Sequence, residues 1–310
     1  MKTMKLTGFA LATVALGFGL MTACSSDDDN NNNIPLPPIG GYNNAGEVGK
    51  ADLLAYWPLN GSGVESKSNT APSTTVGTSW VAGPKGQAAN FTNGYMKYPS
   101  IAALTSNLNA FTISAWVKVK NNQTPTSGSV STIFTMSRPN EWEGNINLYV
   151  ETGQRPAMTD TGVKNDSIVF KGGFRSSVSG GQAYDNILHL ETWMAADNLL
   201  TPGKHVASPN VVADTWAQAV VTWDGTTHKL LIYSNGQKIN NPAFEVRGDN
   251  TSIIFDTPSS PVIGAFGNVE TTTDTWNKAM TGQVDEIRVW KKALTASDIG
   301  SLYSLEKAGR

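Results

Sequence analysis

Aromatic side chains surrounded by amides and acids are the residues of this chain best suited to hold a ligand. A flat ring can cover the apolar face of a sugar, while nearby amides or carboxylates hold its hydroxyl groups. Four rings stand in such surroundings, in segments typical of loops: Trp142, Tyr184, Trp193 and Trp276. The polar neighbours expected to act with them are Asn140, Asn145, Asp185 and Asn186. Burial of each ring beneath a neighbouring loop is the alternative, because tryptophan is highly buried on average.

Acid pairs that could hydrolyse a glycosidic bond are scarce. That reaction needs two carboxyl groups roughly 5 to 9 Å apart, one of them kept protonated by its surroundings. The nearest pairs are Glu141 with Glu143, in a presumed loop, and Asp285 with Glu286, which should point to opposite faces of a strand. The three histidines lack metal-ligand spacing, and neither a phosphate-binding loop nor a serine elbow occurs. The sequence therefore predicts a protein that is not an enzyme.

The lone cysteine, Cys24, follows a segment with the layout of a secretory signal. Residues 1–5 carry two positive charges, and the run to Met21 is uncharged. The tetrad that ends at Cys24 resembles the bacterial lipobox, which implies a signal peptide over residues 1–23 and acylation of the cysteine. Two or more acyl chains hold a protein durably on a membrane. The acids that follow resemble an export tag for the outer face of the outer membrane, so a cell-surface location is expected.

Composition separates a tether from a single large domain. Residues 24–49 are rich in asparagine, proline and glycine, which predicts a flexible tether carrying the acidic run. Residues 50–310 are expected to form one domain of an ordinary size for an all-β sandwich. The formal net charge is −2 and gives no basis for binding nucleic acid.

Short strands must position the loop residues. Alternation is clearest in FTISAWVKVK, where Phe111 and every second residue to Val119 form the apolar face and Trp116 lies on the other. Residues 216–239 predict a hairpin meander, with turns at Asp224-Gly225 and Asn235-Gly236. Thr295 and Asp298 predict a capping box that opens a short helix near the C-terminus. Further strands are expected at 53–59, 88–91, 95–98, 131–136, 146–151, 187–192, 261–263 and 283–290.

Four stretches in order resemble the laminin-G-like branch of the concanavalin A-like lectin/glucanase superfamily. They are LLAYWPLNGS, FTISAWVKV, WAQAVVTWDG with the following LLIYSNGQ, and TGQVDEIRVWKKALTASDIGSLY. The resemblance implies an all-β fold, a jelly-roll sandwich of two antiparallel sheets, with one short C-terminal helix. The chain from about 121 to 210 is longer than a minimal relative needs and is expected to be a loop insertion that carries what is particular to this protein.

The resemblance also implies a calcium ion and bears on catalysis. Many relatives bind calcium through oxygen ligands near the first strand, together with the acid that opens the last long strand. Carried over residue by residue, this implies Asn60, Glu65, Asn69 and Asp285 as metal ligands. The glucanase branch carries its acids as Glu-x-Asp-x-x-Glu on one strand, and this chain has no such triplet.

These observations predict a lipid-anchored surface protein whose sandwich binds carbohydrate without catalysis. Neighbouring proteins that process glycans at the surface are expected partners. The alternative is an interaction or adhesion module that recognises another protein, and a glycoside hydrolase is the third possibility.

Overall fold

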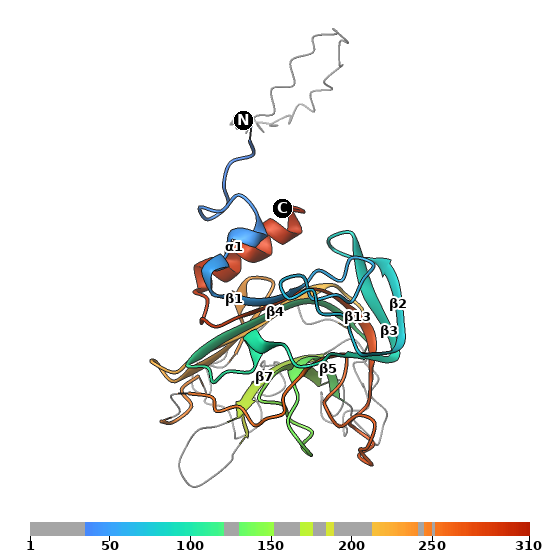
Figure 1. Ribbon diagram of the computed structural model, residues 1–310. Coiled ribbons are helices and arrows are strands. Elements are labelled where there is room, and N and C mark those ends of the chain that lie inside the picture. The colour runs from blue at the N-terminus through green and yellow to red at the C-terminus, as the bar shows by residue number, and fades with distance from the viewer. Residues whose placement is uncertain are drawn as a thin grey trace, which may run out of the picture. The chain divides into compact units, whose positions relative to one another are not determined.

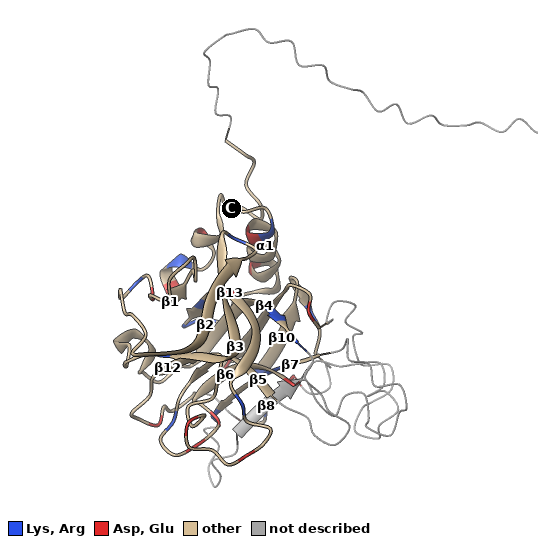
Figure 2. Cartoon of the chain, turned by 90° about the vertical axis from the view of Figure 1, so that its right-hand side faces the viewer, with Lys and Arg blue, Asp and Glu red and all other residues tan. Residues whose placement is uncertain are grey.

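Short antiparallel strands form most of the computed structural model (Figure 1), which describes residues 35–120, 130–151, 168–175, 184–188, 213–240, 245–249 and 252–310. For 184–188 it describes the backbone alone. The compact unit runs from Pro37 to Arg310. Figure 2 shows positive and negative positions interspersed, mainly in loops and turns, while most strand positions are uncharged.

Thirteen strands within the described ranges join into one antiparallel sheet that curls into two layers (Figure 1). The first layer holds β1 (Leu53–Trp57), β2 (Thr74–Ala82), β3 (Gln87–Lys97), β4 (Ala110–Val119), β9 (Ala217–Asp224), β10 (Lys229–Ser234), β11 (Gln237–Lys238) and β13 (Met280–Trp290). The second holds β5 (Val130–Met136), β6 (Ile146–Glu151), β7 (Val169–Arg175), β8 (Tyr184–Leu188) and β12 (Pro261–Ile263). Long β3 joins the layers by pairing with both β13 and β12. The predicted jelly-roll sandwich is confirmed.

The space between the layers is filled by the apolar faces of both. In β4 the predicted alternation holds, and Phe111, Ile113 and Val117 all lie in this core. Trp57, Trp223 and Phe174 come from three other strands and join them. Each fully buried side chain of this size stabilises the fold by roughly 1.5 to 3 kcal/mol.

One helix, α1 (Ala296–Lys307), lies on the outer face of the first layer (Figure 1). Thr295 and Asp298 form the predicted capping box. Ile299, Leu302 and Leu305 pack on Trp290, which points away from the core. None of the helices in the described part is long and apolar enough to cross a membrane.

The start of the domain lies earlier than the sequence predicts. Ala45 and Val48 are buried in the cluster beneath α1, and the Trp290 indole donates a hydrogen bond to the Val48 carbonyl at 3.1 Å. Short 3₁₀ turns at Ala45–Glu47 and Lys50–Asp52 lead into β1. The tether prediction is therefore wrong for residues 37–49. This segment belongs to the compact unit, and Ala45 and Val48 in it pack into the apolar cluster between α1 and Trp290.

The stretch 121–210 is also more regular than predicted. It is not a single loop insertion, because β5, β6, β7 and β8 within it form most of the second layer. Strand β7 was not predicted because glycine interrupts its apolar alternation. Glycine is needed there, since a Cβ on Gly172 would lie 2.2 Å from a methyl carbon of Val221 in the facing layer. A third 3₁₀ turn, Ala102–Leu104, connects β3 to β4. Strand β2 was not predicted either, since its mostly exposed residues show little apolar alternation.

Candidate ligand-binding site

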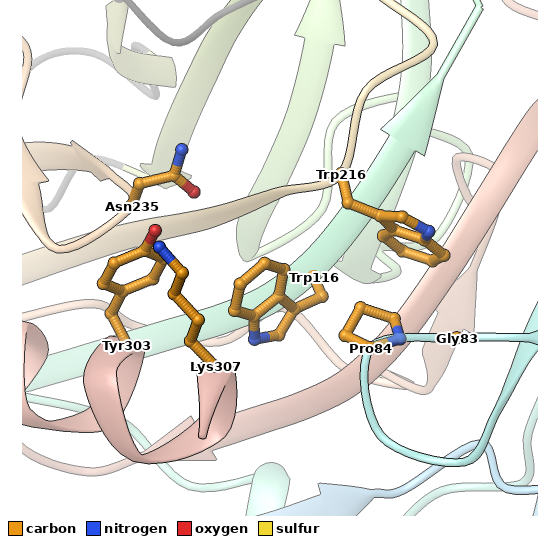
Figure 3. A pocket seen from close by; sticks show the side chains of 7 residues that line it. All are labelled: Gly83, Pro84, Trp116, Trp216, Asn235, Tyr303 and Lys307. Atoms are coloured by element: carbon orange, nitrogen blue, oxygen red, sulfur yellow. The ribbon is translucent and has the colours of Figure 1, made fainter. Parts of the chain in front are cut away.

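A hollow of about 380 Å³ lies between the outer face of the first layer and α1. Figure 3 shows the side chains around it, which come from the turn before β3, from β4, from the start of β9, from the β10–β11 turn and from α1. We call it the helix-flank pocket. It is lined by Gly83, Pro84, Trp116, Trp216, Asn235, Tyr303 and Lys307.

Trp116 forms the centre of this pocket because β4 alternates. Its even-numbered residues point away from the core, so the indole faces α1 rather than the facing layer. The ring is stacked on Tyr303 with centroids 5.6 Å apart and planes 21° apart. Its Nε1–H donates to Glu306 Oε2 at 2.7 Å, which satisfies the indole and fixes its orientation.

The opposite wall is a turn held by a buried acid. Gly83 and Pro84 line the pocket, and the Lys85 amide donates to Asp285 Oδ2 at 3.2 Å. Asp285 is 0% exposed and pairs across the sheet with Trp116. Burial, together with the neighbouring Glu286, raises the pKa of Asp285 to about 7. Gly83 must lack a side chain, since a Cβ there would lie 2.8 Å from Asp285 Oδ2.

Polar groups gather at the end of the pocket nearer α1. In Figure 3 the Tyr303 hydroxyl and the Lys307 ammonium lie at the Asn235 end, away from Trp216 and Pro84. Lys307 Nζ lies 5.5 Å from the centre of the Tyr303 ring. Asn235 adopts a φ of 50°, and its side-chain oxygen accepts from the Gln218 amide at 2.9 Å. The pocket thus joins aromatic walls to a polar end, the combination suited to a sugar ring.

The predicted loop aromatics are only partly brought together. Trp142 and Trp276 lie edge to face with ring centroids 5.1 Å apart, and Phe266 packs on Trp142 at the same separation. We call these three rings the loop cluster. Both tryptophans are half-buried, so each ring is partly packed against its neighbours and partly open to solvent. Asn140 is exposed beside them, with a φ of 61°.

Asn145 is a correction, because it has a structural role. The side chain is 0% exposed, donates to the Ser259 hydroxyl at 3.0 Å and accepts from the Asp256 amide at 2.9 Å. These bonds tie the β5–β6 connection to the 256–260 segment and leave the amide inaccessible to a ligand.

The remaining predicted ligand residues lie elsewhere. Tyr184, Asp185 and Asn186 belong to strand β8 rather than to a loop, paired with Arg175, Phe174 and Gly173. Trp193 lies outside the described residues.

The acid pairs considered for catalysis are held by arginines. Glu141 and Glu143 both approach the guanidinium of Arg138, at 3.8 and 3.6 Å. Burial raises the pKa of Glu143 above its ordinary value, although the charge of Arg138 acts in the opposite direction. Glu286 pairs with Arg288 at 2.6 Å.

The expectation that Asp285 and Glu286 point to opposite faces is wrong. A β-bulge shifts the register after Asp285, and Glu286 has a φ of 54°. Asp285 lies opposite Trp116, and Glu286 accepts from the Tyr56 hydroxyl at 2.7 Å, so both carboxylates lie on the α1 side.

The residues implied as calcium ligands have other contacts. Glu65 accepts from the amides of Tyr56, Lys67 and Ser68, which fixes the turn after β1. Asn60 accepts from the Gln87 amide at 3.0 Å, and Asn69 is exposed with a φ of 56°. In the described part of the chain, no three His, Cys, Asp or Glu side chains are grouped to hold a metal ion. This geometry does not fit a calcium site built on Glu65, and calcium binding stays a prediction.

The pocket residues were missed because ligand-binding rings were expected in loops, and the tryptophans in strands were not considered as ligand residues. The signal was present in the pattern: Trp116 stands on the polar face of an otherwise strictly alternating strand. Trp216 lies immediately before β9 and is half-buried, whereas Trp223 near the end of that strand is in the core. Tyr303 and Lys307 were not predicted as ligand residues, because the sequence of a helix does not show which face of the sheet it covers.

Comparison with solved structures supports the fold. The chain is similar to the binding domain of Paraclostridial Mosquitocidal Protein 1, with a TM-score of 0.54 and 14% identity over 82% of this chain and 52% of that one. It is similar to the binding domain of botulinum neurotoxin serotype G, with a TM-score of 0.52 and 12% identity over 82% and 51%. For the serotype D ligand binding domain in complex with N-acetylneuraminic acid, the values are 0.51 and 12% over 84% and 52%. The chain thus spans about half the length of these three.

Comparison of sequences gives a family match over part of the chain. No curated protein sequence matches the chain. Residues 158–300, however, match the family described as the concanavalin A-like lectin/glucanases superfamily, in its Laminin_G_3 group. That segment runs from the second layer into α1 and includes Trp216 and Asn235. Residues 158–300, slightly less than half of the chain, are therefore similar to the concanavalin A-like lectin/glucanase superfamily.

Proposed function

We propose that the protein binds carbohydrate in the helix-flank pocket and does not hydrolyse it. The observation that carries this proposal is the pocket itself, where the half-buried rings of Trp216 and Tyr303 offer ring surface beside an amide and an ammonium group, with the buried Trp116 ring between them. Sugars combine apolar C–H faces with hydroxyl edges, so they match such a lining. None of the seven lining residues is an acid, which supports binding rather than acid-base catalysis.

The comparisons support the same proposal at a coarser level. The three similar structures are binding domains, and one of them holds N-acetylneuraminic acid. The superfamily of the matched segment is one of lectins and glucanases. A protein ligand is the competing proposal, and a blank glycan array with a protein captured from envelope extract would favour it.

Trp216→Ala is expected to weaken glycan binding at least tenfold. The half-buried ring forms the end wall of the pocket, and a lost aromatic contact with its buried area is worth about 1.5 kcal/mol or more. The measurement is calorimetric titration of the chain beginning at Ser25 with a glycan selected on an array. Trp142→Ala is the matched control, since it removes a half-buried tryptophan of the loop cluster. Loss of affinity in the control alone would move the site to the loop cluster.

We further propose that Cys24 anchors the protein to the outer membrane with the domain at the cell surface. There the bound polysaccharide would be presented to neighbouring glycan-processing proteins. The support is the signal-like leader and the lipobox-like tetrad, which lie outside the described residues.

Cys24→Ala is expected to leave the protein without lipid and to remove it from the membrane fraction. Acylation needs the thiol, and no other cysteine is present in the chain. Labelling with an alkyne fatty acid and fractionation of cells measure both effects. Equal labelling of the variant and the parent protein would contradict the anchor.

A further inference from the structure

From the charges around the helix-flank pocket we infer that its ligand is an acidic saccharide, with the carboxylate of a sugar acid bound by Lys307. This inference rests on the proposed function and names the class of sugar. It follows from three features of the pocket: the position of the ammonium group, the absence of a counter-ion for it among the described residues, and the burial of the acids beneath.

Lys307 is placed to meet a ligand rather than the protein. It is the last residue of α1 and is exposed, and its side chain runs beside Tyr303 (Figure 3). Its nitrogen lies 5.5 Å from the centre of the tyrosine ring, a cation–π contact that holds the ammonium group at the polar end of the pocket. Among the described residues, no carboxylate lies within ion-pair distance of it.

The acids nearest the pocket are buried and do not belong to its lining. Glu306 is 1% exposed, points beneath the pocket and pairs with Arg288. Its second oxygen accepts from Trp116 and Gln218, each at 2.7 Å. Asp285 is buried behind the turn of Gly83 and accepts two backbone amides. A bound ligand therefore meets one cation and no exposed anion in the pocket lining.

The two ends of the pocket match the two ends of a uronic acid. Trp216 and Pro84 form an apolar end, and Asn235, the Tyr303 hydroxyl and Lys307 form a polar end (Figure 3). A pyranose ring carries its carboxylate on one edge, so stacking of the ring at the apolar end directs that group toward the ammonium. A charge-assisted hydrogen bond to a carboxylate is shorter and stronger than one to a neutral hydroxyl.

The test uses acidic polysaccharides and their carboxyl-reduced counterparts, which keep the backbone and lose only the charge. The panel is polygalacturonate, alginate, hyaluronan and heparosan, each in both forms, titrated onto the chain beginning at Ser25. For at least one pair, the acidic form is expected to bind about three- to tenfold tighter in 50 mM NaCl. The preference should shrink in 500 mM NaCl, because an exposed ion pair is screened.

Lys307→Gln is expected to bring the acidic form to the affinity of its reduced counterpart. Lys291→Gln is the matched control, since it also removes one exposed lysine, changes the formal charge by the same amount and should keep the preference. Tighter or equal binding of the reduced forms, or an unchanged preference in Lys307→Gln, would overturn the inference and leave the proposed function standing. A panel that is blank in both forms, with neutral glycans also blank on an array, would overturn both.

Discussion

Replacing Arg288 by methionine is expected to lower the free energy of unfolding by about 3 to 5 kcal/mol. The guanidinium is 2% exposed between the first layer and α1. It pairs with Glu286 at 2.6 Å and with Glu306, and its centre lies 4.3 Å from the centre of the Tyr56 ring. Methionine preserves most of the volume and removes the charge, so two buried carboxylates lose their cation.

The pKa shifts of Arg288 and Glu306 agree with a strong interaction between the arginine and its two carboxylates. Burial alone lowers the pKa of Arg288, but Glu306 and Glu286 outweigh it and raise the pKa above its ordinary value. Burial raises the pKa of Glu306, while Arg288 lowers it. Without the arginine, the Glu306 carboxyl is driven further toward the protonated form. The loss of stability should therefore be smaller at pH 5 than at pH 8.

Urea unfolding followed by tryptophan fluorescence measures the effect on the chain beginning at Ser25. Arg288→Met with Glu306→Gln is the matched comparison, because it removes one of the two orphaned charges and keeps an acceptor for Trp116 and Gln218. The double variant is expected to be more stable than the single one. A single variant within 1 kcal/mol of the parent protein would show that the network contributes little.

The sequence predicts the parts of the fold that depend on regular alternation. Phe111, Ile113 and Val117 are apolar at every second position, and a half-buried strand is the one element that uses this pattern. The capping box at Thr295 and Asp298 is equally local, since both partners lie within one turn. These features need no knowledge of the rest of the chain.

The parts that were missed depend on contacts between distant segments. Glycine is required at position 172 of β7 because Val221 of the facing layer leaves no room for a side chain, which no local pattern reveals. Ala45 looked like tether because its apolar partners, Leu302 and Leu305, lie more than 250 residues later. The bulge at Glu286 required a left-handed φ in a residue that seldom adopts it, and this placed both acids on one face.

The pocket could be predicted only in part for the same reason. Trp116 was correctly placed on the outer face of its strand, but the helix that turns this face into a pocket wall is remote in sequence. The loop prediction brought Trp142 and Trp276 to one place without knowing that Phe266 would share it. The aromatic and amide residues of the sequence indicated a carbohydrate ligand, but only the tertiary structure shows which aromatic rings lie together.

Asp285→Asn is expected to flatten the dependence of stability on pH between about 5 and 8. The pKa of Asp285 is raised to about 7 in the folded protein, whereas the unfolded value is about 4. The folded state thus keeps a proton that the unfolded chain has released, so this contribution is present below about pH 4 and is lost as the pH rises through about 7. Its full size is on the order of 2 to 4 kcal/mol.

The measurement is urea unfolding at pH 5, 6, 7 and 8. Asp274→Asn is the control, because it removes an exposed acid from the connection between β12 and β13 and should keep the parent slope. Asparagine retains one oxygen that can accept the Lys85 amide, so the turn that carries Pro84 should persist. The variant should then bind glycan at pH 6 as the parent protein does. Equal slopes for Asp285→Asn and the parent protein would show that this carboxyl does not titrate between pH 5 and pH 8.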